Sequence, residues 1–490
     1  MPAVAAALGM ALSFYTYPFF ISTSYGRYLL FSLVLLLVVI VSFLRTVSLF
    51  PGAKHSAINM LAIAAAVGFV LGLASRQTVR SSVEMGLPPE TVTTVSGVLV
   101  EDPRTLQGGS GLGIVRLREC GAGGGLRATA RGKLTVFFPS ESIPRLKEFG
   151  RGCEIFLDGS LLLASRGPVF NASSVHIVKP APALETLRSA LRTKLLDKFQ
   201  SRQGREAPVW GGLASALLLG MRDDLDVDLS REFMDSGCAH VLALSGMHLA
   251  ILSGVLVFLI RRPLGIRWAS LIGAVFIVVY VFVAGSQPSL VRSAIMYFIG
   301  CFALWGLLKG KPISLLCMAF IIQLVFQSES GISLSFILSY LALAGILTMG
   351  ETFRSLFRGR LPEIINGSLS ASLGAFIVSS TVVAAFFGTL RPIGIAASLL
   401  VVPLSSLFIV LALITLIVSF IPLPLWDLLD FLCGWVYRSL EAVVSFAGRV
   451  PGITVSNPLP VLLFTIIFWL AIMFVKKRDY SHRSSVAPFD

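Results

Sequence analysis

The sequence predicts a polytopic α-helical membrane protein with an inserted extracytoplasmic β-rich domain, and three observations support this fold class. Hydrophobic residues make up 55% of the 490 residues and charged residues only 13%, whereas charged residues make up about 25% of a typical soluble domain. Apolar runs such as 28–44, 268–284 and 459–475 approach the length that a helix needs to cross about 30 Å of hydrocarbon. Residues 76–207 instead alternate polar and β-branched residues. A disordered or wholly soluble protein is therefore excluded.

The N-terminal part, residues 1–75, contains three apolar runs, at 3–20, 28–44 and 57–74. A secretory signal carries a charged segment before its apolar run. No charged segment precedes Ala3. We therefore expect the first run to be retained as a membrane helix.

Residues 76–182 are predicted to form a small β-barrel or sandwich. Short stretches rich in β-branched residues are separated by glycine, proline and polar residues, and they cover 91–100, 113–119, 133–138, 153–163 and 173–178. The glycine-rich segments within this part do not lie between a clear strand and a helix, so we interpret them as hairpin loops and not as phosphate-binding loops.

Residues 183–207 are predicted to form an amphipathic linker helix. Apolar residues recur at helical spacing while charged residues occupy the other faces; the apolar ones are Leu184, Leu187, Leu191, Leu195 and Phe199. Two placements remain open from the sequence: the helix lies on the membrane surface, or it packs on the β domain.

Residues 208–478 return to apolar runs and are predicted to form a second transmembrane domain, followed by a short tail at 479–490. Two of the runs do not read as simple spans. The run 208–221 is too short to cross a membrane unaided, and the run 392–421 contains Pro403 and several serines. We expect both to be re-entrant or broken helices that line a polar path.

Short loops rich in Lys and Arg predict the orientation, because such loops face the cytoplasm. They include Arg45 and Lys54, Arg261, Arg262 and Arg267, Lys309 and Lys311, Arg354, Arg358 and Arg360, and Lys476, Lys477 and Arg478. This pattern predicts that both termini are cytoplasmic and that residues 76–207 lie outside. That outer part has 19 Lys and Arg against 12 Asp and Glu, which suits either a bound polyanion or a mixed solvated surface. An oxidising outer compartment also makes Cys120 and Cys153 candidates for a disulfide.

The stretch from Phe233 to Leu249 places His240, Ser245 and His248 at the start of an apolar run. Polar side chains in such runs face a bundle interior or an aqueous path. Ser245 and His248 have the spacing of a nucleophile and a base on one helical face, but no GxSxG turn accompanies them. The two histidines are eight residues apart, which is not the spacing of paired metal ligands on a helix. Hydrogen-bonded histidines that fix helix packing are the remaining interpretation.

Several enzyme classes lack their motifs in this sequence. Neither Gly-Lys pair completes the GxxxxGK[ST] loop of nucleotide hydrolases. The six cysteines and five histidines form no CxxC, HxH or HExxH motif. We therefore expect no catalytic residues, no metal and no cofactor, and we expect any energy from nucleotide hydrolysis to come from another chain.

The same stretch resembles the signature of ComEC-type competence proteins, membrane channels for DNA uptake in bacteria, in which H-L-L-A-x-S-G-L-H is typical. Further segments resemble the family's L-L-L-G-x-R and A-G-x-x-P-S-x-x-R-A-x-x-M motifs in the same order. They are Leu217-Leu-Leu-Gly-Met-Arg222 and Ala284-Gly-Ser-Gln-Pro-Ser-Leu-Val-Arg-Ser-Ala-Ile-Met296. The segment Phe387-Gly-Thr-Leu-Arg-Pro-Ile-Gly394, through Pro403-Leu404, also resembles the family. The resemblance covers nearly the whole chain.

The resemblance implies a cytoplasmic (inner) membrane channel that admits single-stranded DNA, with an OB-like outer domain. Its implied path or gate residues are Arg222, His240, Ser245, Gly246, His248, Pro288, Arg292, Ser398 and Pro403. The two arginines are the candidates for phosphate contact, because a guanidinium stays charged in a poorly hydrated site. Pro288 and Pro403 are expected to break helices beside the path. The implied partners are an outer DNA receptor, a cytoplasmic translocase ATPase and a separate nuclease chain.

The sequence also departs from the family pattern. Gly331-Ile-Ser-Leu-Ser-Phe336 stands where G-F-Q-L-S-F is usual, and Ser398 stands where an asparagine is expected. Many relatives continue into a metallo-β-lactamase-like domain, whose metal motif is not found before Asp490, so we do not expect nuclease activity. The competing hypothesis is a secondary transporter or exporter of a small or lipid-linked substrate, built from the same broken helices.

Overall fold

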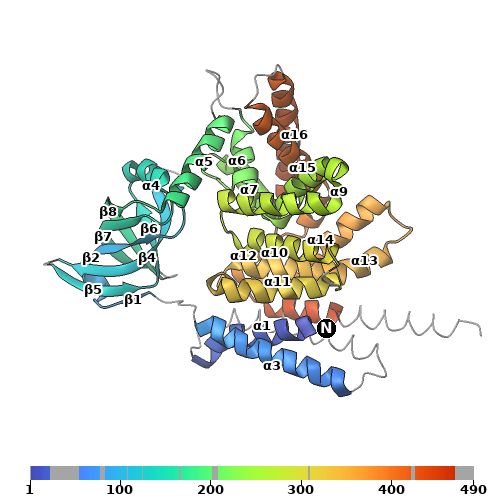
Figure 1. Ribbon diagram of the computed structural model, residues 1–490, viewed down its shortest axis with the longest axis horizontal. Helices are drawn as coiled ribbons and strands as arrows, with labels where there is room; N and C mark the ends of the chain where they lie inside the picture. The colour runs from blue at the N-terminus through green and yellow to red at the C-terminus, as the bar shows by residue number, and fades with distance from the viewer. Residues whose placement is uncertain are drawn as a thin grey trace, which may run out of the picture.

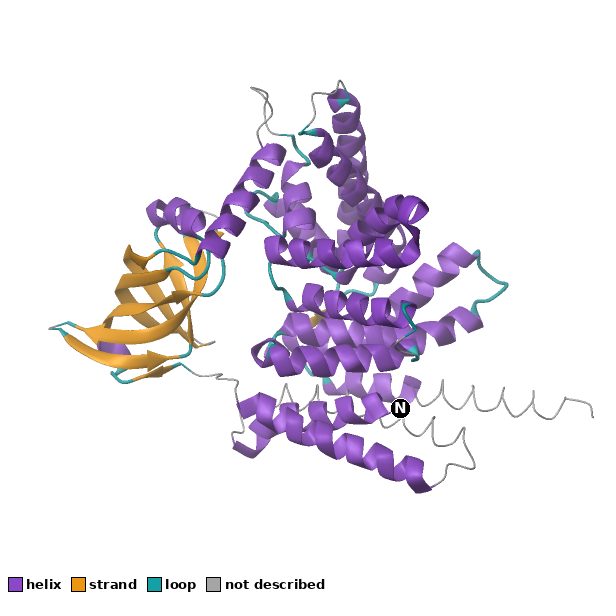
Figure 2. Cartoon of the chain, in the orientation of Figure 1, coloured by secondary structure: helices purple, strands orange, loops and turns teal. Residues whose placement is uncertain are grey.

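The structure is a computed structural model in which a β domain stands beside a large helical region (Figures 1 and 2). It describes residues 2–21, 55–77, 83–106, 109–123, 125–164, 167–200, 208–306, 310–420 and 425–469. The predicted span 28–44 and the tail 479–490 lie outside the described residues, as does the end of the predicted span 459–475.

The β domain is built on a closed circuit of five strands, β2, β4, β6, β8 and β7. All neighbouring pairs in this circuit are antiparallel except β6 and β8, which are parallel. The strands of the domain are β1 (Glu84–Met85), β2 (Val92–Leu99), β3 (Arg104–Thr105), β4 (Gly111–Ala122), β5 (Leu126–Arg131), β6 (Lys133–Phe138), β7 (Glu154–Ala164) and β8 (Gly167–Lys179). Alternate residues such as Val95, Val115 and Leu157 point inward and are fully buried. The short helix α4 (Ile143–Phe149) connects β6 to β7.

The helical region begins with α1 (Pro2–Ile21) and α3 (His55–Gln77), which pack against each other. After the β domain come α5 (Ala183–Gln200), α6 (Gly211–Leu219), α7 (Val227–Asp235), α8 (Ala239–Leu242), α9 (Gly246–Ala284), α10 (Pro288–Leu304), α11 (Pro312–Phe326), α12 (Leu334–Gly345), α13 (Glu351–Leu356), α14 (Glu363–Phe387), α15 (Ile393–Val418) and α16 (Trp426–Gly448). Two short strands, β9 (Thr389–Leu390) and β10 (Ile453–Thr454), pair after α14.

Four of the described helices are long and apolar enough to cross a membrane: Gly246–Ala284, Leu334–Leu356, Glu363–Phe387 and Ile393–Val418. The outer surface of α9 carries exposed Val275, Val278 and Val279, as a face toward lipid would. A multi-pass membrane protein with a separate β domain, as the sequence predicts, is confirmed.

Helix α9 is two helices joined at a turn. Gly265 has φ of 77° and ψ of 162°, a conformation that glycine adopts readily because it has no Cβ. The two halves fold back on each other, since a Cβ on Gly273 would lie 3.0 Å from Cγ2 of Val257. The basic residues Arg261, Arg262 and Arg267 surround the turn. Gly246, where the first half begins, and Ala284, where the second half ends, therefore both lie at the end of the hairpin away from this turn.

The two runs that do not read as simple spans have different outcomes. Helix α6 has nine residues, so it cannot cross a membrane by itself. Helix α15, by contrast, continues through Pro403 as one helix of 26 residues, and the expected break there is wrong. Proline removes one backbone donor, but neighbouring helices and serine hydroxyls can keep such a helix intact. Ser405 and Ser406 both donate to the carbonyl of Val402, at 2.9 and 2.7 Å, whereas the carbonyl that loses its usual helical donor at Pro403 is that of Leu399.

Helix α5 packs on the β domain and on the end of α9 through its charged face. Arg188 and Ser189 are buried, whereas Leu184 and Leu187 are 67% and 53% exposed. Leu184 and Leu187 therefore point away from the protein while the arginines point inward, and Phe199, at the other end of the same apolar stripe, is buried in the helical core. The reason is an ion-pair network described below.

Candidate functional site

Three segments that are far apart in the sequence meet around α8. The guanidinium Nη2 of Arg222, just after α6, donates to the carbonyl of Leu242 at 2.9 Å. The hydroxyl of Ser289, in the first turn of α10, donates to the carbonyl of Leu244 at 2.6 Å. A Cβ on Gly220, which has φ of +71°, would lie 2.5 Å from Cδ1 of Leu244. The segments 217–222, 239–248 and 284–296 thus form one cluster.

A fourth segment, 387–394, joins the same cluster through Gly237. Arg391 donates to the carbonyl and to the carboxylate of Asp235, both at 2.7 Å. Backbone atoms of Gly394 and Gly237 are so close that a Cβ on either would lie near 3 Å from the other. Ser398 is buried, donates to the carbonyl of Gly394 at 2.5 Å, and lies 3.9 Å from Sγ of Cys238.

Ser245 and His248 cap the N-terminus of α9. The backbone N–H of Ser245 donates to Nδ1 of His248 at 3.1 Å, and the hydroxyl of Ser245 lies 2.9 Å from the same nitrogen. Since Nδ1 accepts the backbone proton, the ring proton belongs on Nε2. His248 is 0% exposed, and its Nε2 has no partner among the described residues. The pair is arranged as a helix cap, and no carboxylate orients the imidazole as a catalytic triad requires.

Gly246 brings the first turn of α9 against α10. A Cβ on Gly246 would lie 2.2 Å from the hydroxyl of Ser293 and 3.0 Å from Nη2 of Arg292. Any larger residue would push these groups away. Glycine at this position therefore permits the close approach of the two helices.

Arg292 is a buried arginine without a carboxylate partner in the described part of the chain. Its side chain is 8% exposed. Nη1 donates to the carbonyl of Ser339, Nη2 lies 3.5 Å from the hydroxyl of Ser293, and the guanidinium lies 5.8 Å from the ring centroid of Tyr340. Its Nε has no partner among the described residues. A carbonyl and a ring face do not neutralise a full positive charge.

The remaining predicted site residues, His240, Pro288 and Pro403, lie at three different positions in the fold. His240 lies exposed on α8. Pro288 occupies the first turn of α10, where proline is favoured; it begins a helix, so the expectation that it breaks one is wrong. Pro403 lies exposed on α15, and no contact in the described residues joins it to the cluster.

The sequence reasoning missed Gln323 and Tyr340. The amide Nε2 of Gln323 donates to the carbonyl of Pro288 at 2.9 Å, and its Oε1 accepts from the hydroxyl of Tyr340 at 2.8 Å. Gln323 is fully buried. The available signal is a single amide inside the apolar run 312–326, because buried amides in membrane helices bond across helices.

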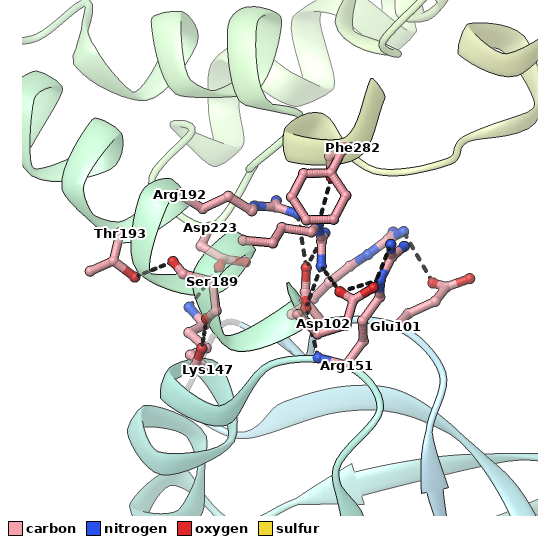
Figure 3. A network of polar contacts seen from close by, with 12 residues as sticks. Glu101, Asp102, Lys147, Arg151, Ser189, Arg192, Thr193, Asp223 and Phe282 are labelled. Atoms are coloured by element: carbon pink, nitrogen blue, oxygen red, sulfur yellow. Dashed lines mark hydrogen bonds and ion pairs between the residues drawn. The ribbon is translucent and has the colours of Figure 1, made fainter. Parts of the chain in front are cut away.

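A second polar network, centred on Asp102, joins the β domain to the helical region (Figure 3). Arg188 donates from Nη2 to Asp102 at 2.7 Å, and Arg192 donates to the same carboxylate at 2.8 Å. Nε of Arg188 donates to the carbonyl of Phe282, near the end of α9, at 2.9 Å. Burial raises the pKa of Asp102, but Arg192, Arg188 and the backbone N–H of Arg151 outweigh it, and the net pKa is below its ordinary value.

Asp223, the residue after Arg222, provides another attachment of the β domain. Its carboxylate accepts from Nζ of Lys147 at 2.6 Å and from the backbone N–H of Thr105 at 3.1 Å. Arg222 is exposed to solvent, and partial desolvation, followed by the charge of Arg104 in β3, lowers its pKa. The β domain is thus held directly beside the cluster.

The candidate disulfide between Cys120 and Cys153 is wrong for this structure, in which both thiols are free and buried. Cys120 lies on β4 opposite Val95 of β2, and Cys153 precedes β7, which pairs with the other edge of β2. A whole strand therefore separates the two cysteines. Burial raises the pKa of Cys153 to about 11, so that thiol is protonated at neutral pH.

No three His, Cys, Asp or Glu side chains gather where they could hold a metal ion in the part of the chain that the structure describes. The donors of the cluster around α8 are instead guanidinium, hydroxyl and backbone N–H groups. Such groups bind oxyanions.

Comparison with known proteins identifies similar chains. A family model described as competence protein matches residues 217–479. The chain is 28% identical to ComE operon protein 3 of Bacillus subtilis (strain 168) over 286 residues, which cover 55% of this chain and 35% of that protein. It is 23% identical to an uncharacterized protein of Aquifex aeolicus (strain VF5) over 346 residues, which cover 69% of this chain and 77% of that protein. The chain thus spans only about a third of the length of the Bacillus protein. No solved structure matches.

Proposed function

The chain belongs to the ComEC family of competence proteins, and from this premise we propose that it is a membrane channel through which single-stranded DNA enters the cell during natural transformation. The observation that carries the proposal is the placement of Arg222 and Arg292. Both belong to segments that converge on α8, and neither has a carboxylate partner in the described residues. A guanidinium that no carboxylate neutralises, beside a path through the membrane, attracts an anion that moves along this path.

The outer position of the β domain is supported by α9. Arg188 contacts the carbonyl of Phe282 at the end of the second half of α9, whereas the basic turn is at Gly265. A helix of this length separates the two points by roughly 25 Å, close to the thickness of the hydrocarbon layer. If the basic turn is cytoplasmic, the β domain lies outside. Cytoplasmic termini stay a prediction from the loop charges.

We further propose that the β domain is an OB-like barrel that guides the strand toward the cluster. The five-strand circuit, with a helix between β6 and β7, is the arrangement of strands that such barrels use. Its sheet carries Arg118, Arg127 and Phe156 around a pocket that Glu119 and Glu154 also line, and Arg118 is ion-paired with Glu154. Cationic and aromatic side chains together suit a single strand, whose phosphates and bases they contact.

The proposed role is transport and not catalysis, so the driving and cutting of DNA belong to other chains. A DNA receptor on the outer side, a translocase ATPase on the cytoplasmic side and a separate nuclease are the partners that this role requires. The transporter hypothesis predicts that deletion leaves DNA uptake unchanged.

Uptake of labelled DNA in a naturally competent host provides the test. Deletion of the host's homologue is expected to abolish entry of labelled single strands, and this chain is expected to restore it. Arg222→Gln should reduce the restored uptake at normal membrane abundance. Arg231→Gln, which changes an exposed arginine of α7 paired with Asp228, is the matched control and should retain it.

Failure of the well-expressed chain to restore uptake, in a host where the host's own homologue restores it, would contradict the channel proposal.

A further inference from the structure

The first turn of α9 has donors that the protein leaves unused. A helix N-terminus presents backbone N–H groups without intrahelical partners and carries a partial positive charge. Ser245 and His248 hydrogen-bond to each other in the cap. The N–H groups of Gly246 and Met247 have no partner among the described residues. Both residues are only half-buried, so a solute can approach them.

Arg292 supplies a second, independent indication of a ligand. It is nine-tenths buried, its Nε has no partner in the described residues, and its Nη2 lies against Gly246. The unused ring N–H of His248 belongs to the same helical turn. Every unsatisfied group here is a donor, and no carboxylate in the described residues pairs with Arg292.

We propose that the first turn of α9, together with Arg292 and Ser293 of α10, forms a phosphodiester-binding site. In it the backbone N–H groups of Gly246 and Met247 and the guanidinium of Arg292 hold the oxygens of one phosphate. This inference rests on the proposed function and deepens it, because it places the first phosphate contact of the strand inside the bundle. The site lies at the end of the α9 hairpin that carries the β domain.

The geometry also separates two ways of damaging this site. Arg292→Gln removes the charge, while Gly246→Ala keeps every charge and introduces a methyl group 2.2 Å from the hydroxyl of Ser293 and 3.0 Å from Nη2 of Arg292. Arg292→Lys keeps a point charge without the forked donors. Arg449→Gln, at an exposed arginine after α16, is the matched control.

The test measures the affinity of the purified full chain, in detergent, for a fluorescent oligothymidylate at several salt concentrations. Arg292→Gln and Gly246→Ala are each expected to weaken binding at least ten-fold, because a charge-assisted contact is lost or displaced. The slope of log affinity against log salt concentration should also be smaller in Arg292→Gln, by about the amount that one phosphate contact contributes. Arg292→Lys should fall between, and Arg449→Gln should match the original chain. Melting temperatures report whether each variant is folded.

The source of the phosphate is resolved by competition. Inorganic phosphate and the soluble headgroup glycerophosphoglycerol are added against the labelled oligonucleotide. Displacement by unlabelled oligonucleotide at far lower concentrations than by the headgroup supports a site for the strand. Equal or better displacement by the headgroup would overturn that assignment in favour of a lipid site.

The inference and the proposed function fail in distinguishable ways. If the original chain restores uptake but folded Arg292→Gln and Gly246→Ala variants bind and import DNA normally, the site is wrong and the channel survives. If Arg292 only ties α10 to Ser339 of α12, Arg292→Gln should lower the melting temperature while Gly246→Ala, where folded, leaves oligonucleotide affinity unchanged. That result also overturns the site.

Discussion

Arg188 and Arg292 are both buried arginines, but their surroundings differ. Arg188 is 2% exposed and contacts two carboxylates, Asp102 at 2.7 Å and Glu185 at 3.2 Å. Arg292 is 8% exposed and contacts a carbonyl, a hydroxyl and an aromatic ring. Within the described residues, carboxylates neutralise the charge of Arg188, and none neutralises that of Arg292.

The difference indicates a structural role for Arg188 and a ligand-binding role for Arg292. A buried charge is costly unless it is paired, so the pairs of Arg188 hold the β domain to α5 and to the end of α9. A charge without a counter-ion among the described residues, in a segment that the competence-protein family model covers, fits the proposed contact with an anion. Stability and uptake measurements on matched variants can therefore test whether the two arginines have these different roles.

The largest loss of stability is expected from Asp102→Asn. This change removes the carboxylate shared by Arg188 and Arg192. It leaves Arg188 with Glu185 alone and takes from the largely buried Arg192 its ion-pair partner, at a cost of about 3–5 kcal/mol. Denaturant unfolding of the full chain in detergent measures it. Asp158→Asn, at a more exposed carboxylate of the same β domain, should change stability by much less. Equal effects of the two changes would mean that the network around Asp102 does not hold the domain.

A smaller loss is expected from Arg188→Met. Asp102 keeps Arg192 and the N–H of Arg151, so the loss is about 1–3 kcal/mol. Arg292→Met removes an unpaired charge and should leave stability within about 1 kcal/mol. Parallel unfolding curves measure both. If Arg292→Met is the more damaging change, the distinction between the two arginines is lost.

Acidification should release the β domain only at low pH. The pKa of Asp102 in the folded protein is below its ordinary value of 3.8, so its ion pairs stabilise the fold fully above that value. The stabilisation is lost as the pH falls through the lowered folded-state pKa. Energy transfer between dyes on the β domain and α16 should stay constant from neutral pH to about pH 5 and fall only in stronger acid. In Asp102→Asn, this acid-dependent step should disappear, and its persistence would assign it to another group.

The smallest effect is expected from Glu329→Gln. Glu329 forms ion pairs with Lys133 at 2.5 Å and with Arg116 at 3.8 Å, but all three side chains are substantially exposed. Exposed pairs contribute about 0–1 kcal/mol and are screened by salt. Unfolding at low and high salt should show a small difference that vanishes at high salt. A large, salt-independent loss would place this contact among the structural ones.

Part of the candidate site could be predicted from the sequence. Ordered motifs identified Arg222, Gly246 and Arg292, and the family they indicate is confirmed. Their convergence on α8 could not be predicted, because contacts such as Arg292 to Ser339 join separate helices. Gln323 was not predicted, because a single amide in an apolar run forms no recognisable sequence motif.

By itself, the sequence determined the membrane class, the separate β-rich part and the basic loop at 261–267, because hydropathy, alternation and charge act locally along the chain. Only the tertiary structure decided which way α5 faces. Its leucine periodicity leaves open a face on the membrane or a face packed on the β domain, but Asp102, 86 residues before Arg188, places the arginines and not Leu184 or Leu187 against the β domain. The separation of Cys120 from Cys153 by β2 and the continuity of α15 through Pro403 were decided in the same way. Each depends on which distant groups become neighbours, and periodicity along one segment carries no information about its partners.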